Sequence, residues 1–181
     1  MYFPKRGPAN TAATVAAVLR AAEEHGIRHV VVASSSGETA RAFLGMEGIR
    51  VTCVTHAYGT SEDGKNDMAE ATRQELKNKG VTVVTASHVL SGVERGVSSR
   101  GGGMYPAEIM SYTLRMLGEG LKVCVEVAVM ALDAGAIPHG ENIIAVGGTG
   151  KGADTAVILS PAHAAKVFQT KIHKIICKPY L

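Results

Sequence analysis

Residues 29–40 read HVVVASSSGETA. The first five are almost all apolar, which is typical of a strand buried on both faces of a sheet. Three serines and Gly37 then end this strand, and Glu38–Leu44 predicts a short helix that stops before Gly45. A strand, a turn and a helix in this order indicate half of a βαβ unit. A parallel sheet covered by helices on both faces follows from it.

The alternation of strand and helix continues on both sides of this stretch. Apolar runs predict further strands at Arg50–Thr55, Val81–Thr85, Asn142–Val146, Thr155–Leu159 and Ile172–Cys177. Helical spacing and end signals predict helices at Thr11–His25, Asp67–Lys79, Leu121–Ala134 and Pro161–Phe168, and another that begins at Pro106. The segment Ser87–Tyr105, rich in glycine and serine, is predicted to lack regular structure. The loop between the fourth and fifth strands is too short for a crossover helix, so these two strands should be antiparallel.

Composition limits the function classes. A chain of 181 residues with 46% hydrophobic and 19% charged residues predicts one folded domain over residues 1–181. The net charge is +3, and no run of Lys and Arg is interleaved with aromatics, so we expect no nucleic-acid partner. The three cysteines are scattered, so neither a disulfide framework nor a metal site is expected. No signal peptide is visible, and the most apolar stretch, Leu121–Leu132, is too short to span a membrane. A cytoplasmic protein with no membrane partner is expected.

The first candidate site is the loop after the first strand. Ligands of open α/β sheets bind beyond the carboxyl ends of the strands. A loop of hydroxyls and one glycine before a helix favours a phosphate, which Glu38 would repel unless its side chain points away. The alternative is a capping box made by Ser35 and Glu38. The candidate phosphate ligands are Ser34, Ser35, Ser36, Gly37 and Thr39.

The second candidate site is the glycine loop Gly147–Asp154, which reads GGTGKGAD. It is not a P-loop, because Gly152 follows Lys151 where that motif has Ser or Thr. It is not a dinucleotide fingerprint, because a strand follows it. Two interpretations stay open: a hairpin turn that needs positive φ angles, or close approach of the backbone to a ligand. The candidate residues are Gly147, Gly148, Thr149 and Gly150.

Two further groups of residues are candidates. In the segment before Pro106, Ser98 and Arg100 could hold an anion and Tyr105 could pack on a flat ring, unless the segment is a plain surface loop. After the second strand, His56 and Tyr58 are acid–base and stacking candidates, although a lone histidine is more often structural. His88 and His139 have the same status.

The loop VVVASSSGETA resembles the effector-phosphate loop in the C-terminal domain of pyruvate kinase. The match falls on Ser34, Ser36, Gly37, Thr39 and Ala40. Glu38 stands where that domain commonly has arginine. The whole chain resembles the free-standing pyruvate kinase alpha/beta domain-like proteins of archaea and bacteria. It shares with them the segments SSRGGG-x-YPAE, GGT-x-x-GADTAV and IICKP.

This resemblance implies a three-layer α/β/α sandwich with a mixed, mostly parallel sheet. Its first strands would lie in the order 3-2-1-4, with the next strand antiparallel. The loops Ser34–Thr39 and Gly147–Asp154 would then be neighbours. The resemblance also implies FMN as the ligand. It further implies that the catalytic barrel of pyruvate kinase, and with it that activity, is absent.

Three functions are therefore considered. The first is a soluble binding domain for a phosphorylated, ring-bearing ligand, FMN above all, which as an enzyme would be a flavin-dependent oxidoreductase. The second is a regulatory or assembly module that senses a phosphometabolite without catalysis. The third is a hydrolase or phosphotransferase that uses His56 or His88. A homo-oligomer is expected, with the last strand, Ile172–Cys177, at a sheet edge that another subunit could pair with.

Overall fold

The computed structural model, in which residues 1–180 are described, contains one seven-stranded sheet. Its strand order is β1-β7-β6-β5-β2-β3-β4. The strands are β1 (Tyr2–Phe3), β2 (His29–Ala33), β3 (Arg50–Thr55), β4 (Thr82–Thr85), β5 (Ile143–Gly147), β6 (Thr155–Ser160) and β7 (Lys171–Pro179). Strands β4, β3, β2 and β5 are parallel neighbours, and β6 is antiparallel to β5. The predicted order 3-2-1-4 and the antiparallel fifth strand are confirmed.

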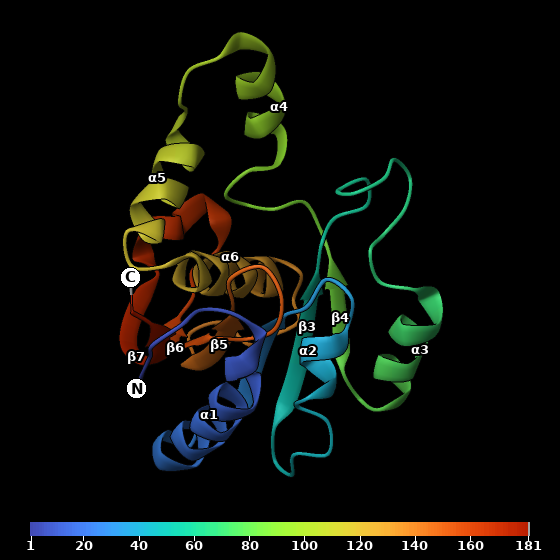
Figure 1. Ribbon diagram of the computed structural model, residues 1–181, viewed down its shortest axis with the longest axis vertical. Coiled ribbons are helices and arrows are strands. Elements are labelled where there is room, and N and C mark those ends of the chain that lie inside the picture. Colours follow the sequence, from blue (N-terminus) through green and yellow to red (C-terminus); the bar gives the residue numbers. More distant parts are fainter. Residues whose placement is uncertain (181) are drawn as a thin grey trace.

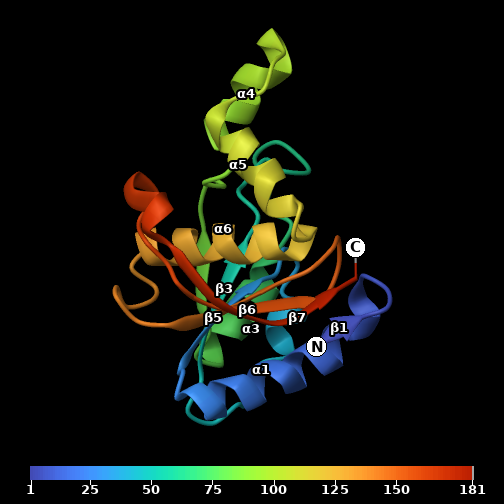
Figure 2. The ribbon, with the colours of Figure 1, turned by 90° about the vertical axis from the view of Figure 1, so that its left-hand side faces the viewer.

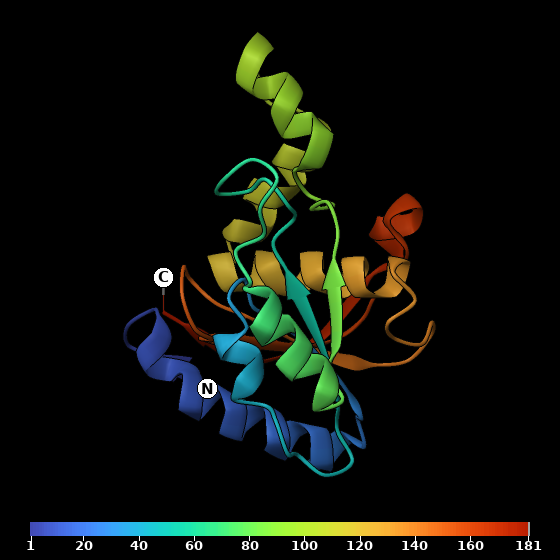
Figure 3. The ribbon, with the colours of Figure 1, turned by 90° about the vertical axis from the view of Figure 1, so that its right-hand side faces the viewer.

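Some of the helices form two outer layers on the faces of the sheet, and others project away from it (Figures 1 and 2). The helices are α1 (Thr11–His25), α2 (Glu38–Arg41), α3 (Glu70–Asn78), α4 (Gly92–Gly101), α5 (Pro106–Arg115) and α6 (Glu119–Asp133), with 3-10 turns η1 (Pro8–Asn10) and η2 (Ala164–Gln169). Helix α6 covers one face of the sheet, and α1 lies on the opposite face with α2 and α3 (Figures 2 and 3). The three-layer α/β/α architecture is thereby confirmed.

Strand β2 shows why its sequence is apolar throughout. Val30 and Val32 belong to the core under α1, whereas Val31 belongs to the core under α6, and all three are fully buried. Successive side chains of a strand point to opposite faces, and here both faces are covered.

Two glycines allow α6 to lie close against the sheet. A Cβ on Gly120 of α6 would lie 2.1 Å from Oγ1 of Thr155 in β6. A Cβ on Gly147 of β5 would lie 2.6 Å from the carbonyl oxygen of Gly120. Both positions exclude any side chain, so the close approach of α6 to β5 and β6 depends on them.

The segment Ser87–Tyr105 corrects one prediction, because residues Gly92–Gly101 form helix α4. Together with α5, this helix projects from the body as an arm (Figure 1). Side-chain contacts join the two helices: Glu94 Oε2 accepts the backbone N–H of Glu108 at 2.9 Å, and Ser98 Oγ donates to Glu108 Oε1 at 2.8 Å. Helical propensity is low in this glycine-rich stretch, so contacts with α5 stabilise the helix.

Three other predictions of local structure need adjustment. The helix expected from Asp67 begins at Glu70, because the Asp67 carboxylate contacts His56 instead of capping the helix. The helix expected over Glu38–Leu44 is regular only to Arg41. The helix expected over Pro161–Phe168 is the 3-10 turn Ala164–Gln169.

The last strand, β7, is not the outermost strand of the sheet. Strand β7 lies between β6 and β1, which the sequence reading missed. However, β1 pairs only with Lys178 and Pro179, so the Lys171–Ile176 part of β7 has a strand on one side only. The N-terminus contacts the last strand here, because the amino group of Met1 donates to the carbonyl of Ile176 at 2.8 Å. Within residues 1–180, no helix is both long and apolar enough to cross a membrane.

Candidate functional site

Two cavities adjoin at the carboxyl ends of the parallel strands. The first, of about 360 Å³, lies between the ends of β2 and β3, helix α6 and the glycine loop. The second, of about 460 Å³, lies between the first-strand loop, the glycine loop and the start of α1. They share five lining residues: Ala33, Ser34, Ser35, Gly150 and Gly152. The two loops named by the sequence therefore form a common wall, as their strand order predicts.

The first-strand loop leaves several backbone donors free. Ser34 Oγ accepts the N–H of Ala40 at 3.4 Å, and Ser36 Oγ contacts the N–H of Glu38 at 3.5 Å. The N–H groups of Ser35, Ser36 and Gly37 have no hydrogen-bond acceptor among residues 1–180. The capping box of Ser35 and Glu38 is wrong, since α2 has Gly37 at its N-cap and no side-chain cap. Thr39, in α2, also lines the second cavity.

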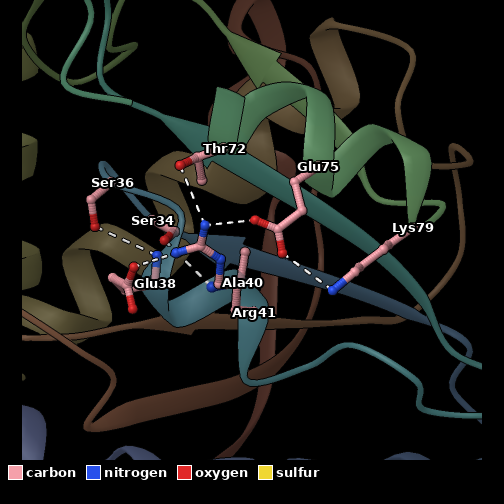
Figure 4. A network of polar contacts seen from close by, with 8 residues as sticks. All are labelled: Ser34, Ser36, Glu38, Ala40, Arg41, Thr72, Glu75 and Lys79. Atoms are coloured by element: carbon pink, nitrogen blue, oxygen red, sulfur yellow. Dashed lines mark hydrogen bonds and ion pairs between the residues drawn. The ribbon is translucent and has the colours of Figure 1, made fainter. Parts of the chain in front are cut away.

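Glu38 borders the second cavity, and its charge is partly balanced (Figure 4). Its carboxylate pairs with Arg41, whose Nη2 also donates to Glu75 Oε2 at 2.7 Å. This hydrogen bond, donated by Arg41 to Glu75, raises the pKa of the Arg41 guanidinium and lowers the pKa of the Glu75 carboxyl. The repulsion that Glu38 would exert on an anion is weakened by this neighbouring cation.

Asp154 holds the glycine loop in place. Its fully buried carboxylate accepts the N–H of Gly7 at 2.9 Å, the N–H of Thr149 at 3.2 Å and the hydroxyl of Thr155 at 2.8 Å. These bonds attach the loop to the N-terminal segment. Thr149 itself faces a different cavity, next to Lys5.

The positive φ angles that the hairpin interpretation requires occur at Gly150 and Gly152. A Cβ on Gly148 would lie 2.4 Å from the Gly152 carbonyl oxygen, and a Cβ on Gly152 would lie 2.6 Å from Thr11 Oγ1. Internal packing therefore explains these two glycines, as it does Gly147. Gly150 has a φ of 81°, with no atom within 4 Å of an added Cβ, and it borders both cavities. Positive φ, and not packing against protein atoms, therefore accounts for glycine at this position.

Two histidines stand over the first cavity. His56 follows β3, and its Nδ1 lies 2.6 Å from Asp67 Oδ2. The ring centroid of His88 lies 5.5 Å from that of His56. Burial lowers the pKa of His88, an effect that Glu126 opposes and His56 reinforces. His88 is thus neutral at pH 7 and able to accept a proton.

An ion pair that the sequence analysis did not select lies in the same wall. Lys122 Nζ donates to Glu126 Oε2 at 2.5 Å, and the two side chains are 8% and 5% exposed. Glu126 Oε1 also accepts the N–H of Leu90 at 3.2 Å. The available signal was two opposite charges four residues apart in an otherwise apolar helix. Lys151, which lines the second cavity, was likewise not selected.

Several predicted residues do not line these cavities. Tyr58 is 59% exposed on the loop after β3. Ser98, Arg100 and Tyr105 belong to the arm, where Ser98 and the backbone of Tyr105 bond to Glu108. His139 stacks on His163 at 5.5 Å. In the part of the chain that the structure describes, no three His, Cys, Asp or Glu residues are grouped to hold a metal, and the three cysteines are free and buried.

The arrangement combines three chemical environments. Free N–H groups, hydroxyls and Lys151 suit an anion at one end. Val54, Val123, Val127 and Met130 line the first cavity with apolar surface. His56, His88 and the Lys122–Glu126 pair can donate, accept and exchange protons at its wall.

The sequence profile of the family described as pyruvate kinase, alpha/beta domain, matches residues 12–159. Among solved structures, a pyruvate kinase of Cryptosporidium parvum is similar, with a TM-score of 0.42 and 15% identity, over 85% of this chain and 24% of that one. The pyruvate kinase of the same organism in complex with ADP has a TM-score of 0.42 and 15% identity, over 93% of this chain and 24% of that one. The chain therefore spans about a quarter of the length of these enzymes.

Proposed function

This chain belongs to the pyruvate kinase alpha/beta domain family, and from this premise we propose that it binds a phosphorylated, ring-bearing ligand, with FMN as the first ligand to test. One observation carries the proposal. The loop after β2 and the glycine loop lie side by side and line two adjoining cavities. One cavity has groups that suit an anion, and the other is partly lined by apolar side chains. Ligands of open α/β sheets bind at such a place, where the strand order reverses.

The phosphate would lie at the shared wall. The N–H groups of Ser35, Ser36 and Gly37 and the hydroxyls of Ser34 and Thr39 supply donors there. Lys151 adds a positive charge, and the open backbone of Gly150 allows close approach. Charge-assisted bonds to a phosphate are about twice as strong as neutral ones, so this end would supply much of the affinity.

The ring would lie in the first cavity. Its volume of about 360 Å³ falls in the usual range of roughly 300–1,000 Å³ for small-molecule sites. Val123, Val127 and Met130 of α6 offer an apolar wall for the face of a flat ring. FMN fits these features: its phosphate matches one end and its ring the other. When bound, it would supply electron and hydride transfer, while the chain's own residues orient it and exclude water.

A second function is favoured by the arm. Its helices expose large apolar side chains, with Val93 86%, Tyr112 55% and Met116 74% exposed. Several large apolar side chains exposed on one projecting arm are typical of a contact with another chain. A regulatory module that assembles through this arm and responds to a phosphometabolite is therefore the alternative. In neither case do we expect turnover of phosphoenolpyruvate.

A titration with FMN tests the binding proposal. Ser36→Asp places a carboxylate among the proposed phosphate donors and should weaken FMN binding by about tenfold or more, through like-charge repulsion. Ser99→Asp, on the exposed surface of α4, is the matched control and should leave the affinity unchanged. If both variants bind FMN with the same affinity as the wild type, the assignment of the phosphate site is wrong.

A further inference from the structure

Stability alone does not explain the buried Lys122–Glu126 pair, although Glu126 accepts the N–H of Leu90. Its side chains are 8% and 5% exposed, in a helix whose other buried residues are apolar or small. Removing two charges from water costs several kcal/mol per ion, so apolar residues would serve packing as well or better. Both side chains line the first cavity. Their position therefore points to a contact with whatever occupies that cavity.

Lys122 presents unused hydrogen-bond donors to the cavity. An ammonium group has three N–H donors. Lys122 uses one of them on Glu126, and no second acceptor contacts it within residues 1–180. The Glu126 carboxylate already receives hydrogen bonds on both oxygens, from Lys122 and from the backbone of Leu90. Because the pair is neutral overall, it suits an uncharged acceptor, such as a carbonyl oxygen, better than an anion.

The polar groups around the Lys122–Glu126 pair leave His88 free to contact an uncharged ligand group as well. The ring nitrogens of His88 have no hydrogen-bond partner in the described part of the chain, so one donor and one acceptor remain available. His56 is occupied by Asp67. Glu119, the other acidic residue of this wall, is occupied by Arg115, whose Nε donates to Glu119 Oε2 at 2.6 Å.

We propose that this wall selects rings that carry carbonyl oxygens: Lys122 donates to a ring carbonyl, and His88 pairs with the adjoining N–H of the ring. The ligand class is then a phosphorylated oxo-heterocycle, with a lactam or imide edge as in FMN, IMP or UMP. The amino edge of AMP or CMP would turn N–H donors toward the donors of Lys122 and leave them unpaired. The inference rests on the phosphate end of the proposed function, because both ligand types are anchored there.

Calorimetric affinities for matched ligands test the inference. IMP and AMP differ in the carbonyl or amino group at one ring carbon and in the proton on the adjoining ring nitrogen, as do UMP and CMP, and ribose 5-phosphate lacks a base. The wild type should bind IMP over AMP and UMP over CMP by about tenfold, the cost of one unpaired buried donor. Lys122→Met with Glu126→Gln removes both charges together, so no lone charge is buried. This double variant should lose the preference and bind FMN about tenfold more weakly, while its affinity for ribose 5-phosphate is unchanged.

The outcomes separate the two proposals. Equal affinities within each pair, a preference that persists in the double variant, or unchanged FMN affinity would overturn the carbonyl assignment and leave the phosphate site standing. If neither FMN nor any other phosphate ester binds, the proposed function itself fails, and the inference with it. The wild-type comparison stands even if the double variant does not fold. Lys77→Met, on the exposed side of α3, is the control and should match the wild type.

Discussion

The Nδ1 atom of His56 lies 2.6 Å from Oδ2 of Asp67 and ties the end of β3 to the loop that precedes α3. Hydrogen bonds from Ser61 and His56 lower the pKa of the Asp67 carboxyl. This contact fixes one wall of the first cavity, because His56 lines it. The same contact diverts Asp67 from the helix-capping role that its spacing to Glu70 predicts.

Asp67→Asn should lower the free energy of unfolding at pH 7 by up to about 1 kcal/mol, because it removes a hydrogen-bonded carboxylate from a partly exposed contact. A carboxyl with a depressed pKa contributes stability above its unfolded pKa and loses it as pH falls through the folded pKa. The difference between variant and wild type should therefore disappear in acid, as measured by urea unfolding. An undiminished difference at pH 3 would contradict this explanation.

His88 should make stability depend on pH near neutrality. Burial lowers its pKa below the ordinary value of 6.5, as it does for His29. The unfolded chain then binds protons more readily than the folded one, so stability is present above pH 6.5 and is lost as pH falls below it. Urea unfolding between pH 7.5 and 5.5 should show this decline, with a shallower slope for His88→Gln. A slope identical to wild type would show that His88 is not buried as described.

Gly152 and Gly150 should respond differently to alanine. Both have positive φ, so each substitution costs about 1–2 kcal/mol of backbone strain. At Gly152 the new Cβ also meets Thr11 Oγ1 at 2.6 Å and Pro8 Cα at 2.7 Å, which adds about 1–3 kcal/mol of overlap. Thermal unfolding should rank Gly152→Ala below Gly150→Ala. Equal melting temperatures would mean that the loop does not pack on the N-terminal segment.

The arm should carry a subunit contact. Tyr112 of α5 and Met116, the residue directly after the end of α5, are four positions apart, and both are exposed. Sedimentation velocity of the wild type should show an oligomer, which Met116→Asp dissociates because a charge in an apolar contact is costly. Phe168→Asp, at a residue 83% exposed outside the arm, should leave the oligomer intact. A monomeric wild type would refute this prediction.

Much of the fold could be predicted because β2, β3 and β5 are buried on both faces and their sequences are largely apolar runs. The segment Leu121–Ala134 was harder, because α6 is surrounded by the sheet, α5 and η2, and its valines alternate as they would in a strand. The length of this segment favours a helix over a strand. Helix α4 could not be predicted, since it has no buried residue and depends on Glu94 and Ser98 contacting α5.

Some residues of the candidate site could be predicted from the sequence, and others could not. Ser34–Ser36 and Gly150 follow strands directly, so the parallel sheet alone places them together. Lys122 and Glu126 come from a helix on the opposite side of the cavity. Their contribution depends on how α6 rotates over the sheet, which Gly120 and Gly147 determine through packing. Residues that reach a site through tertiary packing carry no local signal of it.

The central claim is that a phosphorylated ligand lies between the two loops. An FMN titration of ¹⁵N-labelled protein, followed by the backbone amide resonances, tests its location most directly. The amides of Ser35, Ser36, Gly37 and Gly150 should show the largest and saturable shifts, and riboflavin, which lacks the phosphate, should not reproduce them. Saturable shifts centred on other residues, or equal shifts with riboflavin at these four amides, would contradict the account.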